Sequence, residues 1–181
     1  MIEPTATQRT FLERVRENKG GAVIFAGSGS DESHIEKIVK SLEIYQIPYE
    51  VRVASAHKQS EVVQYLISQY DGYDCGLVYI AVAAGTDALS GMLSWQSHLP
   101  VISCPPDHPN FSCINNPAGS SNMYIGHPSN VGRAVAQVLS IADQRYEKLI
   151  HRSNAEKKQS LKDDDHKLKK KFEEKQWDLN T

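Results

Sequence analysis

The sequence predicts a three-layer α/β/α fold, in which helices cover both faces of a mostly parallel β-sheet. Two observations carry this prediction. Short apolar runs of strand length alternate along the chain with longer segments in which apolar residues recur at helical spacing. The chain has 181 residues, of which 40% are hydrophobic and 23% charged, and this suits one well-buried α/β domain.

The first half of the chain shows this alternation clearly. A short helix is expected at 7–18, where Phe11, Leu12 and Val15 share one face and two glycines follow. Three apolar runs predict strands, and each is followed by a helical pattern. The predicted strands are 22–26 (AVIFA), 49–54 (YEVRVA) and 76–84 (GLVYIAVAA), the last being the most buried in character.

The second half completes the sheet. A fourth strand is expected at 100–104 (PVISC), and a short fifth strand at 123–125 follows a loop rich in Asn, Ser, Pro and Gly. Apolar residues at helical spacing between Val131 and Ala142 predict a final core helix. Successive βαβ units have right-handed crossovers. We therefore expect a flavodoxin-like parallel sheet with additional N- and C-terminal helices.

Three regions are expected along the chain. They are an N-terminal helical extension (1–20), an α/β domain (21–143) and a charged C-terminal helical tail (144–181). In the tail, Leu161, Leu168 and Phe172 form an apolar stripe that is too narrow for a core of its own. This stripe either packs against a neighbouring subunit or stays solvated.

The charge distribution argues against a nucleic-acid partner. The whole chain has a formal net charge of -2. Residues 144–181 hold 11 basic and 8 acidic residues, so the rest of the chain, with 9 and 14, is slightly acidic. A nucleic-acid surface would need a basic face, and the mixed signs in the tail are typical of a solvated helix.

The cysteines predict neither a disulfide framework nor a metal site. Cys75, Cys104 and Cys113 are odd in number and form no CxxC pair. Reduced thiols in or near the core suit a cytoplasmic protein. Residues 1–20 lack the apolar run of a signal peptide, and no apolar run is long enough to span a membrane. We therefore expect a cytoplasmic protein without a membrane partner.

Small and polar residues follow each of the first four predicted strands. In an open parallel sheet, ligands bind beyond the carboxyl ends of the strands, near the point where the strand order reverses. We therefore expect these four loops to converge on one edge of the sheet. They are GSGSD (27–31), SAHK (55–58), AAGTDALSG (83–91) and CPP (104–106).

The GSGSD run has the composition of an anion-binding turn. Its glycines let the backbone approach a ligand, Ser30 or Asp31 can cap the following helix, and free N–H groups at a helix start attract anions. A plain capped turn would look the same. The run matches neither the GxGxxG fingerprint nor a Walker loop, so neither a dinucleotide nor a nucleoside triphosphate is implied.

His57 and Lys58 are the candidate reactive residues. A single histidine is more often structural, but His57 stands beside a lysine and across from the predicted anion-binding turn. Lysine can pair with a phosphate, and the unperturbed pKa of histidine, about 6.5, suits proton transfer near neutral pH. The other histidines show no HExxH spacing, and no GxSxG motif is present. The residues indicate a site for a small phosphorylated molecule, with His57 as acid or base.

Four motifs taken together resemble one known family. They are GSGSD, IPYEVRVASAHK (47–58), ALSGM (88–92) and LPVISCPP (99–106). In this order and spacing they are similar to the aminoimidazole ribonucleotide carboxylase (PurE) family of purine biosynthesis, over about residues 21–143. SAHK and the CPP strand end resemble the class II branch of that family.

The resemblance implies a phosphoribosylaminoimidazole carboxylase, a lyase without cofactor or metal. Such an enzyme adds CO2 to C4 of 5-aminoimidazole ribonucleotide and gives 4-carboxy-5-aminoimidazole ribonucleotide. Two alternatives stay open. One is an N5-carboxyaminoimidazole ribonucleotide mutase, and the other is a diverged, non-catalytic nucleotide-binding protein of the same fold. The resemblance also implies a homo-tetramer or homo-octamer, in which the terminal helices could dock.

The resemblance also implies roles for single residues. Proton transfer falls to His57. Three loops supply the substrate-binding residues: Ser28, Ser30 and Asp31 for the ribose and phosphate region; Ser55, Ala56 and Lys58 for the phosphate; and Ala83, Ala84, Gly85, Thr86, Asp87, Ser90 and Gly91 for the base and CO2.

Two loops depart from the family pattern. Class II relatives read AGRSNALSG where this chain reads AAGTDALSG, so Asp87 stands at an asparagine position. They read LRMPSG where this chain has INNPAG, so Asn115 stands at an arginine position. A carboxylate at Asp87 would repel a carboxylated product unless it is protonated or paired.

Overall fold

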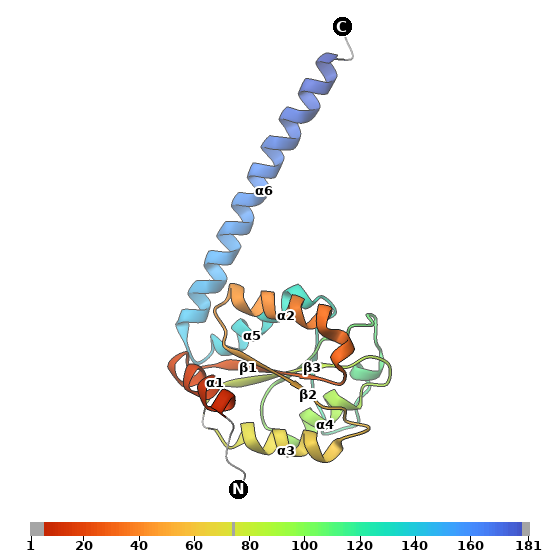
Figure 1. Ribbon diagram of the computed structural model, residues 1–181. Coiled ribbons are helices and arrows are strands. Elements are labelled where there is room, and N and C mark those ends of the chain that lie inside the picture. Colours follow the sequence, from red (N-terminus) through yellow and green to blue (C-terminus); the bar gives the residue numbers. More distant parts are fainter. Residues whose placement is uncertain (1–5, 74, 179–181) are drawn as a thin grey trace.

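The computed structural model describes residues 6–73 and 75–178. Residues 1–5 of the predicted N-terminal extension and 179–181 of the predicted tail lie outside the described residues. The helices and strands, in chain order (Figure 1), are α1 (Ala6–Glu17), β1 (Gly21–Ala26), α2 (Glu32–Ile44), β2 (Tyr49–Val53), α3 (Ser60–Asp71), β3 (Leu77–Val82), α4 (Ala88–Gln96), β4 (Val101–Ser103), β5 (Met123–Tyr124), α5 (Val131–Leu139) and α6 (Gln144–Asp178).

A five-stranded parallel sheet in the order β2-β1-β3-β4-β5 forms the middle layer. This strand order is flavodoxin-like, as the alternation of strands and helices predicts. β1 and β3 are buried along their whole length, because each has a strand on both sides and helices above and below. Since parallel strands end at the same edge, the loops after β1, β2, β3 and β4 share one edge of the sheet.

Alternate residues of the central strands face two separate cores. On one face, Ile24, Ile80 and Ile102 pack with α2, α5 and the beginning of α6. On the other face, Phe25 and Tyr79 pack with α1, α3 and α4, and their ring centroids lie 5.1 Å apart. Helices therefore cover both faces of the sheet (Figure 1), and the predicted three-layer fold is confirmed.

The edge strand β2 is less well covered than the alternation predicts. Tyr49, Val51 and Val53, which alternate along the strand, are 36%, 38% and 56% exposed. β2 lies at the rim of the sheet and pairs only with β1. Cover by helices is therefore complete at the central strands and only partial at this edge strand.

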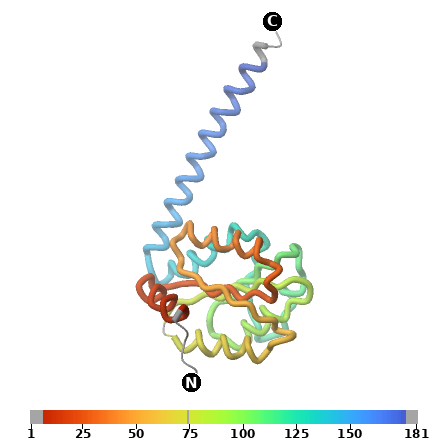
Figure 2. The backbone as a smooth tube through the Cα atoms, viewed as in Figure 1, coloured from red at the N-terminus to blue at the C-terminus, as the bar shows by residue number. Residues whose placement is uncertain are grey.

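The predicted core helix is shorter than its apolar pattern suggests. α5 ends at Leu139, where the chain turns. The N–H group of Asp143 donates a hydrogen bond to Leu139 O at 3.0 Å, an ordinary length for such a bond. Ala142, which the pattern places on the core face, lies beyond this helix and is exposed. The predicted charged helix follows as α6 and extends away from the body of the protein (Figures 1 and 2). None of the helices described is long and apolar enough to cross a membrane.

Candidate active site

The turn after β1 is organised by Ser28. Its Oγ atom accepts a hydrogen bond from the N–H group of Ser30 at 3.2 Å and lies 2.8 Å from Ser30 Oγ. Asp31 occupies the N-cap position of α2, but its side chain makes no capping hydrogen bond. The predicted capping of α2 by Ser30 or Asp31 is therefore wrong, because Ser28 caps a 3-10 turn at Gly29–Asp31 that precedes the helix.

The turn after β2 is held by its own backbone. The N–H group of Ala54 bonds to Ala26 O at 2.9 Å and extends the β1–β2 ladder. The N–H groups of Lys58 and Gln59 both bond to Ser55 O, at 3.2 and 2.8 Å. His57 and Lys58 lie in this compact turn, and both are exposed at the carboxyl edge of the sheet.

A cleft of about 160 Å³ lies beyond the carboxyl ends of β1, β2 and β3. The strand order reverses between β1 and β3, which is where ligands bind in open α/β sheets. Most of the predicted site residues line this cleft, and their roles there stay predictions. They are Ser28, Ser30, Asp31, Ser55, Ala56, His57, Ala83, Ala84 and Thr86.

Three further residues of the cleft wall were not among the predicted site residues. They are Gly27, Ala88 and Leu89. Gly27 directly follows β1, and its N–H group bonds to Val82 O at 2.9 Å. Ala88 and Leu89 belong to the first turn of α4. All three lie inside loops that the sequence places at this edge, 27–31 and 83–91, and this is the signal that could have identified them.

The remaining predicted site residues do not line the cleft: Lys58, Gly85, Asp87, Ser90 and Gly91. Lys58 is exposed, whereas Ser90 is completely buried in α4. A Cβ atom on Gly91 would lie 2.7 Å from Asn116 Oδ1. Gly91 therefore permits α4 to pack closely against the loop that follows β4.

Asp87 is a helix cap. Its Oδ1 atom accepts a hydrogen bond from the N–H group of Ser90 at 2.9 Å. The residue is 4% exposed, and Oδ2 has no hydrogen-bond partner among the described residues. Burial raises the pKa of Asp87, and the hydrogen bonds from Ser90 partly oppose this rise. Because Asp87 is engaged at the start of α4 and does not line the cleft, direct repulsion of a carboxylated product is not expected.

His34 belongs to α2, and its side chain lies where β4 ends. Its Nε2 atom is 3.0 Å from Cys104 O and 3.4 Å from Cys104 Sγ. Burial lowers the pKa of His34 and raises the pKa of the Cys104 thiol to about 12. Both groups are therefore neutral at pH 7, and their contact ties α2 to the end of β4.

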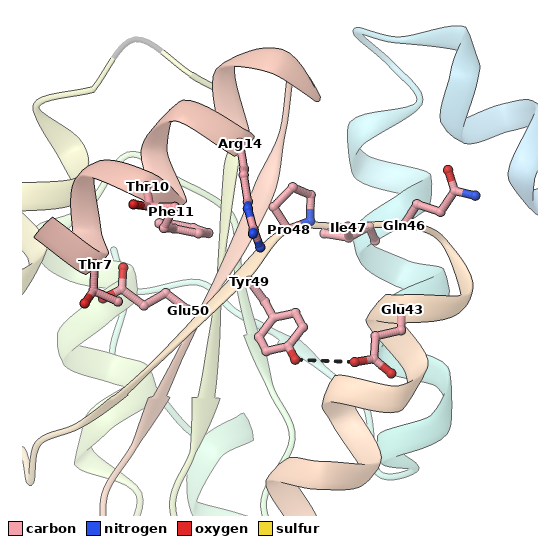
Figure 3. A pocket seen from close by; sticks show the side chains of 10 residues that line it. All are labelled: Thr7, Thr10, Phe11, Arg14, Glu43, Gln46, Ile47, Pro48, Tyr49 and Glu50. Carbon is pink, nitrogen blue, oxygen red and sulfur yellow. Dashed lines mark hydrogen bonds between the residues drawn. The ribbon is translucent and has the colours of Figure 1, made fainter.

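A larger cavity, of about 740 Å³, lies at the amino end of β2, between α1 and the end of α2 (Figure 3). The Tyr49 hydroxyl donates a hydrogen bond to Glu43 Oε1 across it, at 3.4 Å. We favour the smaller cleft as the active site, because it lies at the switch point of the sheet and contains His57.

Residues suited to metal binding do not gather at the cleft. Throughout the part of the chain that the structure describes, no group of three or more His, Cys, Asp or Glu residues could hold a metal ion. The residues that line the cleft instead include four with hydroxyl groups, one carboxylate and one histidine: Ser28, Ser30, Ser55, Thr86, Asp31 and His57. Such a lining suits a polar small molecule with several hydrogen-bonding groups.

Known proteins match this chain over most of its length. A family model described as AIR carboxylase matches residues 22–160. The chain is 31% identical over 154 residues to the phosphoribosylaminoimidazole carboxylase of Treponema denticola, with 82% of this chain and 97% of that protein covered. It is 33% identical over 134 residues to a protein of Methanothermobacter thermautotrophicus named "Probable N5-carboxyaminoimidazole ribonucleotide mutase". That match covers 69% of this chain and 40% of the other protein. The crystal structure of Treponema denticola PurE superimposes with a TM-score of 0.77 at 30% identity, covering 82% and 98% of the two chains.

Proposed function

The chain belongs to the AIR carboxylase (PurE) family, and on that premise we propose that it carboxylates 5-aminoimidazole ribonucleotide at C4 with CO2 in purine biosynthesis. The observation that supports this reaction best is the cleft at the switch point. Loops from β1 and β2 bring Ser28, Asp31 and His57 to one small cavity there. The product is 4-carboxy-5-aminoimidazole ribonucleotide.

In this proposal each loop holds a different part of the substrate. Ser28 and Asp31 bind the ribose and phosphate region. Ser55, in the facing turn, donates a hydrogen bond from its hydroxyl to the phosphate. The exposed Lys58 in the same turn adds a positive charge at the rim of the cleft. The wall after β3, which includes Thr86, lies along the base and CO2.

The proposed reaction forms one carbon–carbon bond and releases one proton. C4 of the electron-rich aminoimidazole attacks the carbon of CO2, and the new carboxylate takes the negative charge. His57 accepts the proton that leaves C4. Alignment of two reactants can supply several kcal/mol of the barrier, and a positioned acid or base typically contributes about 10²- to 10⁴-fold.

A paired substrate assay tests the proposal. Aminoimidazole ribonucleotide and N5-carboxyaminoimidazole ribonucleotide are each supplied without ATP, with and without added bicarbonate as a source of CO2. We expect CO2-dependent carboxylation of the first nucleotide. Turnover of the second alone would favour the mutase, which the similarity to the Methanothermobacter protein makes the second candidate. Turnover of neither nucleotide would contradict both reactions.

The variant His57→Asn tests the proposed proton transfer. We expect turnover to fall by about 10²- to 10⁴-fold, with little change in the free energy of unfolding, because the side chain is exposed. His151→Asn is the matched control, since His151 is an exposed histidine on α6 that lies 3.5 Å from Glu147. Full activity of His57→Asn would remove His57 from the mechanism.

A further inference from the structure

The loop after β3 is held by side chains from the loop after β4. The N–H group of Gly85 donates to Asp107 Oδ2 at 2.7 Å. Gly85 O accepts a hydrogen bond from Asn110 Nδ2 at 2.9 Å and lies 3.0 Å from Ser112 Oγ. The N–H group of Asp87 donates to Ser112 Oγ at 2.9 Å. Three side chains of one loop thus engage backbone groups of the other.

Asn110 is the centre of this network. It is 6% exposed, and its Nδ2 atom also donates to Asp107 Oδ1 at 2.9 Å. Its Oδ1 atom accepts from the N–H group of Ser112 at 3.0 Å and lies 2.6 Å from Ser112 Oγ. The amide hydrogens and the amide oxygen of Asn110 are therefore all used. A buried polar side chain with a full set of partners specifies one local geometry.

The network reaches the wall of the cleft because successive residues of the loop after β3 belong alternately to the wall and to the network. Ala84 and Thr86 line the cleft, whereas Gly85 and Asp87, which alternate with them, are bound by the network. Gly85 also has a φ angle of +68°, which glycine adopts without strain. Holding Gly85 and Asp87 therefore determines where Ala84 and Thr86 stand.

We propose that Asp107, Asn110 and Ser112 form a clamp that fixes this wall of the cleft, and that Asn110 is its central positioning residue. None of the three is among the residues predicted for the site. The clamp itself rests on the hydrogen bonds above, and what the fixed wall binds rests on the proposed function.

Amide hydrogen exchange tests the clamp without any assay of activity. In Asn110→Ala we expect the N–H groups of Gly85 and Asp87 to exchange about tenfold faster. Asp107 and Ser112, which accept these N–H groups, lose their hydrogen bonds to Asn110, and Gly85 O loses one as well, so local opening breaks fewer bonds. The N–H group of Ile80 in β3 serves as the internal reference. Asn115→Ala is the matched control, since the exposed Asn115 bonds to Phe111 O within the same loop at 3.0 Å. Unchanged exchange at Gly85 and Asp87 in Asn110→Ala would overturn the clamp.

A conservative pair at Ser112 separates the clamp from general stability. Ser112→Ala removes the hydroxyl that accepts the N–H group of Asp87, and Ser112→Thr retains a hydroxyl. We expect Ser112→Ala to exchange like Asn110→Ala and Ser112→Thr to exchange like the wild type, with the melting temperature of each variant measured alongside. Equal acceleration in both Ser112 variants would show that the hydroxyl is not responsible and would count against the clamp.

Kinetics with aminoimidazole ribonucleotide test the positioning role. We expect kcat of Asn110→Ala to fall by roughly 10- to 100-fold, with a smaller change in KM, because small misplacement chiefly disturbs alignment while the loops around Ser28 and Ser55 stay intact. Ser112→Thr should keep the wild-type kcat. Faster exchange combined with wild-type kcat and KM would overturn the positioning role. If the wild type converts neither nucleotide, the proposed function fails, and the exchange measurements still decide the clamp.

Discussion

Asp87 shows how its surroundings set the role of a single carboxylate. From sequence it is a charged residue in a predicted substrate loop, but in the structure it caps α4 and is buried. Burial raises its pKa above the ordinary value of 3.8. The folded protein therefore binds the proton of the Asp87 carboxyl group more tightly than the unfolded chain does. The stability linked to this group is fully present below pH 3.8 and is lost as pH rises through the raised pKa.

Asp87→Asn should consequently stabilise the protein more at pH 7 than at pH 4. Asparagine caps a helix about as well as aspartate, and it has no charge to bury. Urea denaturation at the two pH values measures the difference. Asp87→Ala is the control for the cap and should be about 1 kcal/mol less stable than Asp87→Asn. An effect of Asp87→Asn that is the same at both pH values would contradict the assigned burial of charge.

At the scale of elements, α2 and α5 meet at one very close contact. A Cβ atom on Gly132 would lie 1.9 Å from Ser41 O, so only glycine fits without movement of a helix. The N–H group of Gly132 also donates to Ser41 Oγ at 2.9 Å, and both residues are buried. This contact sets how closely α5 packs beside α2, the helix that begins just after the Ser28 turn.

Gly132→Ala should therefore be strongly destabilising. Overpacking a well-filled site typically costs about 1–3 kcal/mol, and here the clash is with backbone, so we expect the upper end of that range or more. Gly29→Ala is the matched control, because a Cβ atom there meets nothing within 4 Å; we expect its effect to stay within about 0.5 kcal/mol. Urea denaturation of both variants measures the contrast, and similar stabilities for the two would refute the close-packing account.

At the scale of the whole molecule, the long helix α6 leaves the body with an uncovered apolar stripe. The helix extends away from the body (Figure 2), and every side chain from 155 to 175 is exposed. Leu161, Leu168 and Phe172 lie on one face and are 58%, 55% and 59% exposed. Most helical stability in proteins comes from packing an apolar face. We therefore propose that a second copy of the chain covers this stripe in a homo-oligomer.

Each of the substitutions Leu168→Glu and Phe172→Glu should then shift the homo-oligomer toward smaller species. A charge buried without a partner disfavours association, so we expect a lower mass by light scattering on a gel-filtration column. Lys170→Glu, on the opposite face of α6, is the control for added negative charge. A wild-type mass near the 20.2 kDa of one chain would refute the oligomer. An unchanged oligomer in both stripe variants would show that the interface lies elsewhere.

Much of the fold follows from patterns that are local in the sequence. Strand-length apolar runs and helical spacing are properties of neighbouring residues, and they predict the order of the elements and the parallel sheet. The rule that ligands bind at the carboxyl ends of parallel strands then brings Ser28, Ser55 and His57 to one edge, where the cleft lies. The boundaries are less well predicted. α5 stops short of Ala142 because the chain turns there, which an apolar pattern does not register.

The sequence by itself determined the fold class, the family motifs and the edge of the sheet at which the candidate cleft lies. Only the tertiary structure decided that Asp87 caps a helix, that Lys58 stands outside the cleft, and that Asn110 holds the loop opposite. The physical reason is distance along the chain. Asn110 bonds to Gly85, 25 residues earlier, and such pairings depend on how two loops meet at one sheet edge rather than on the spacing of residues within either loop.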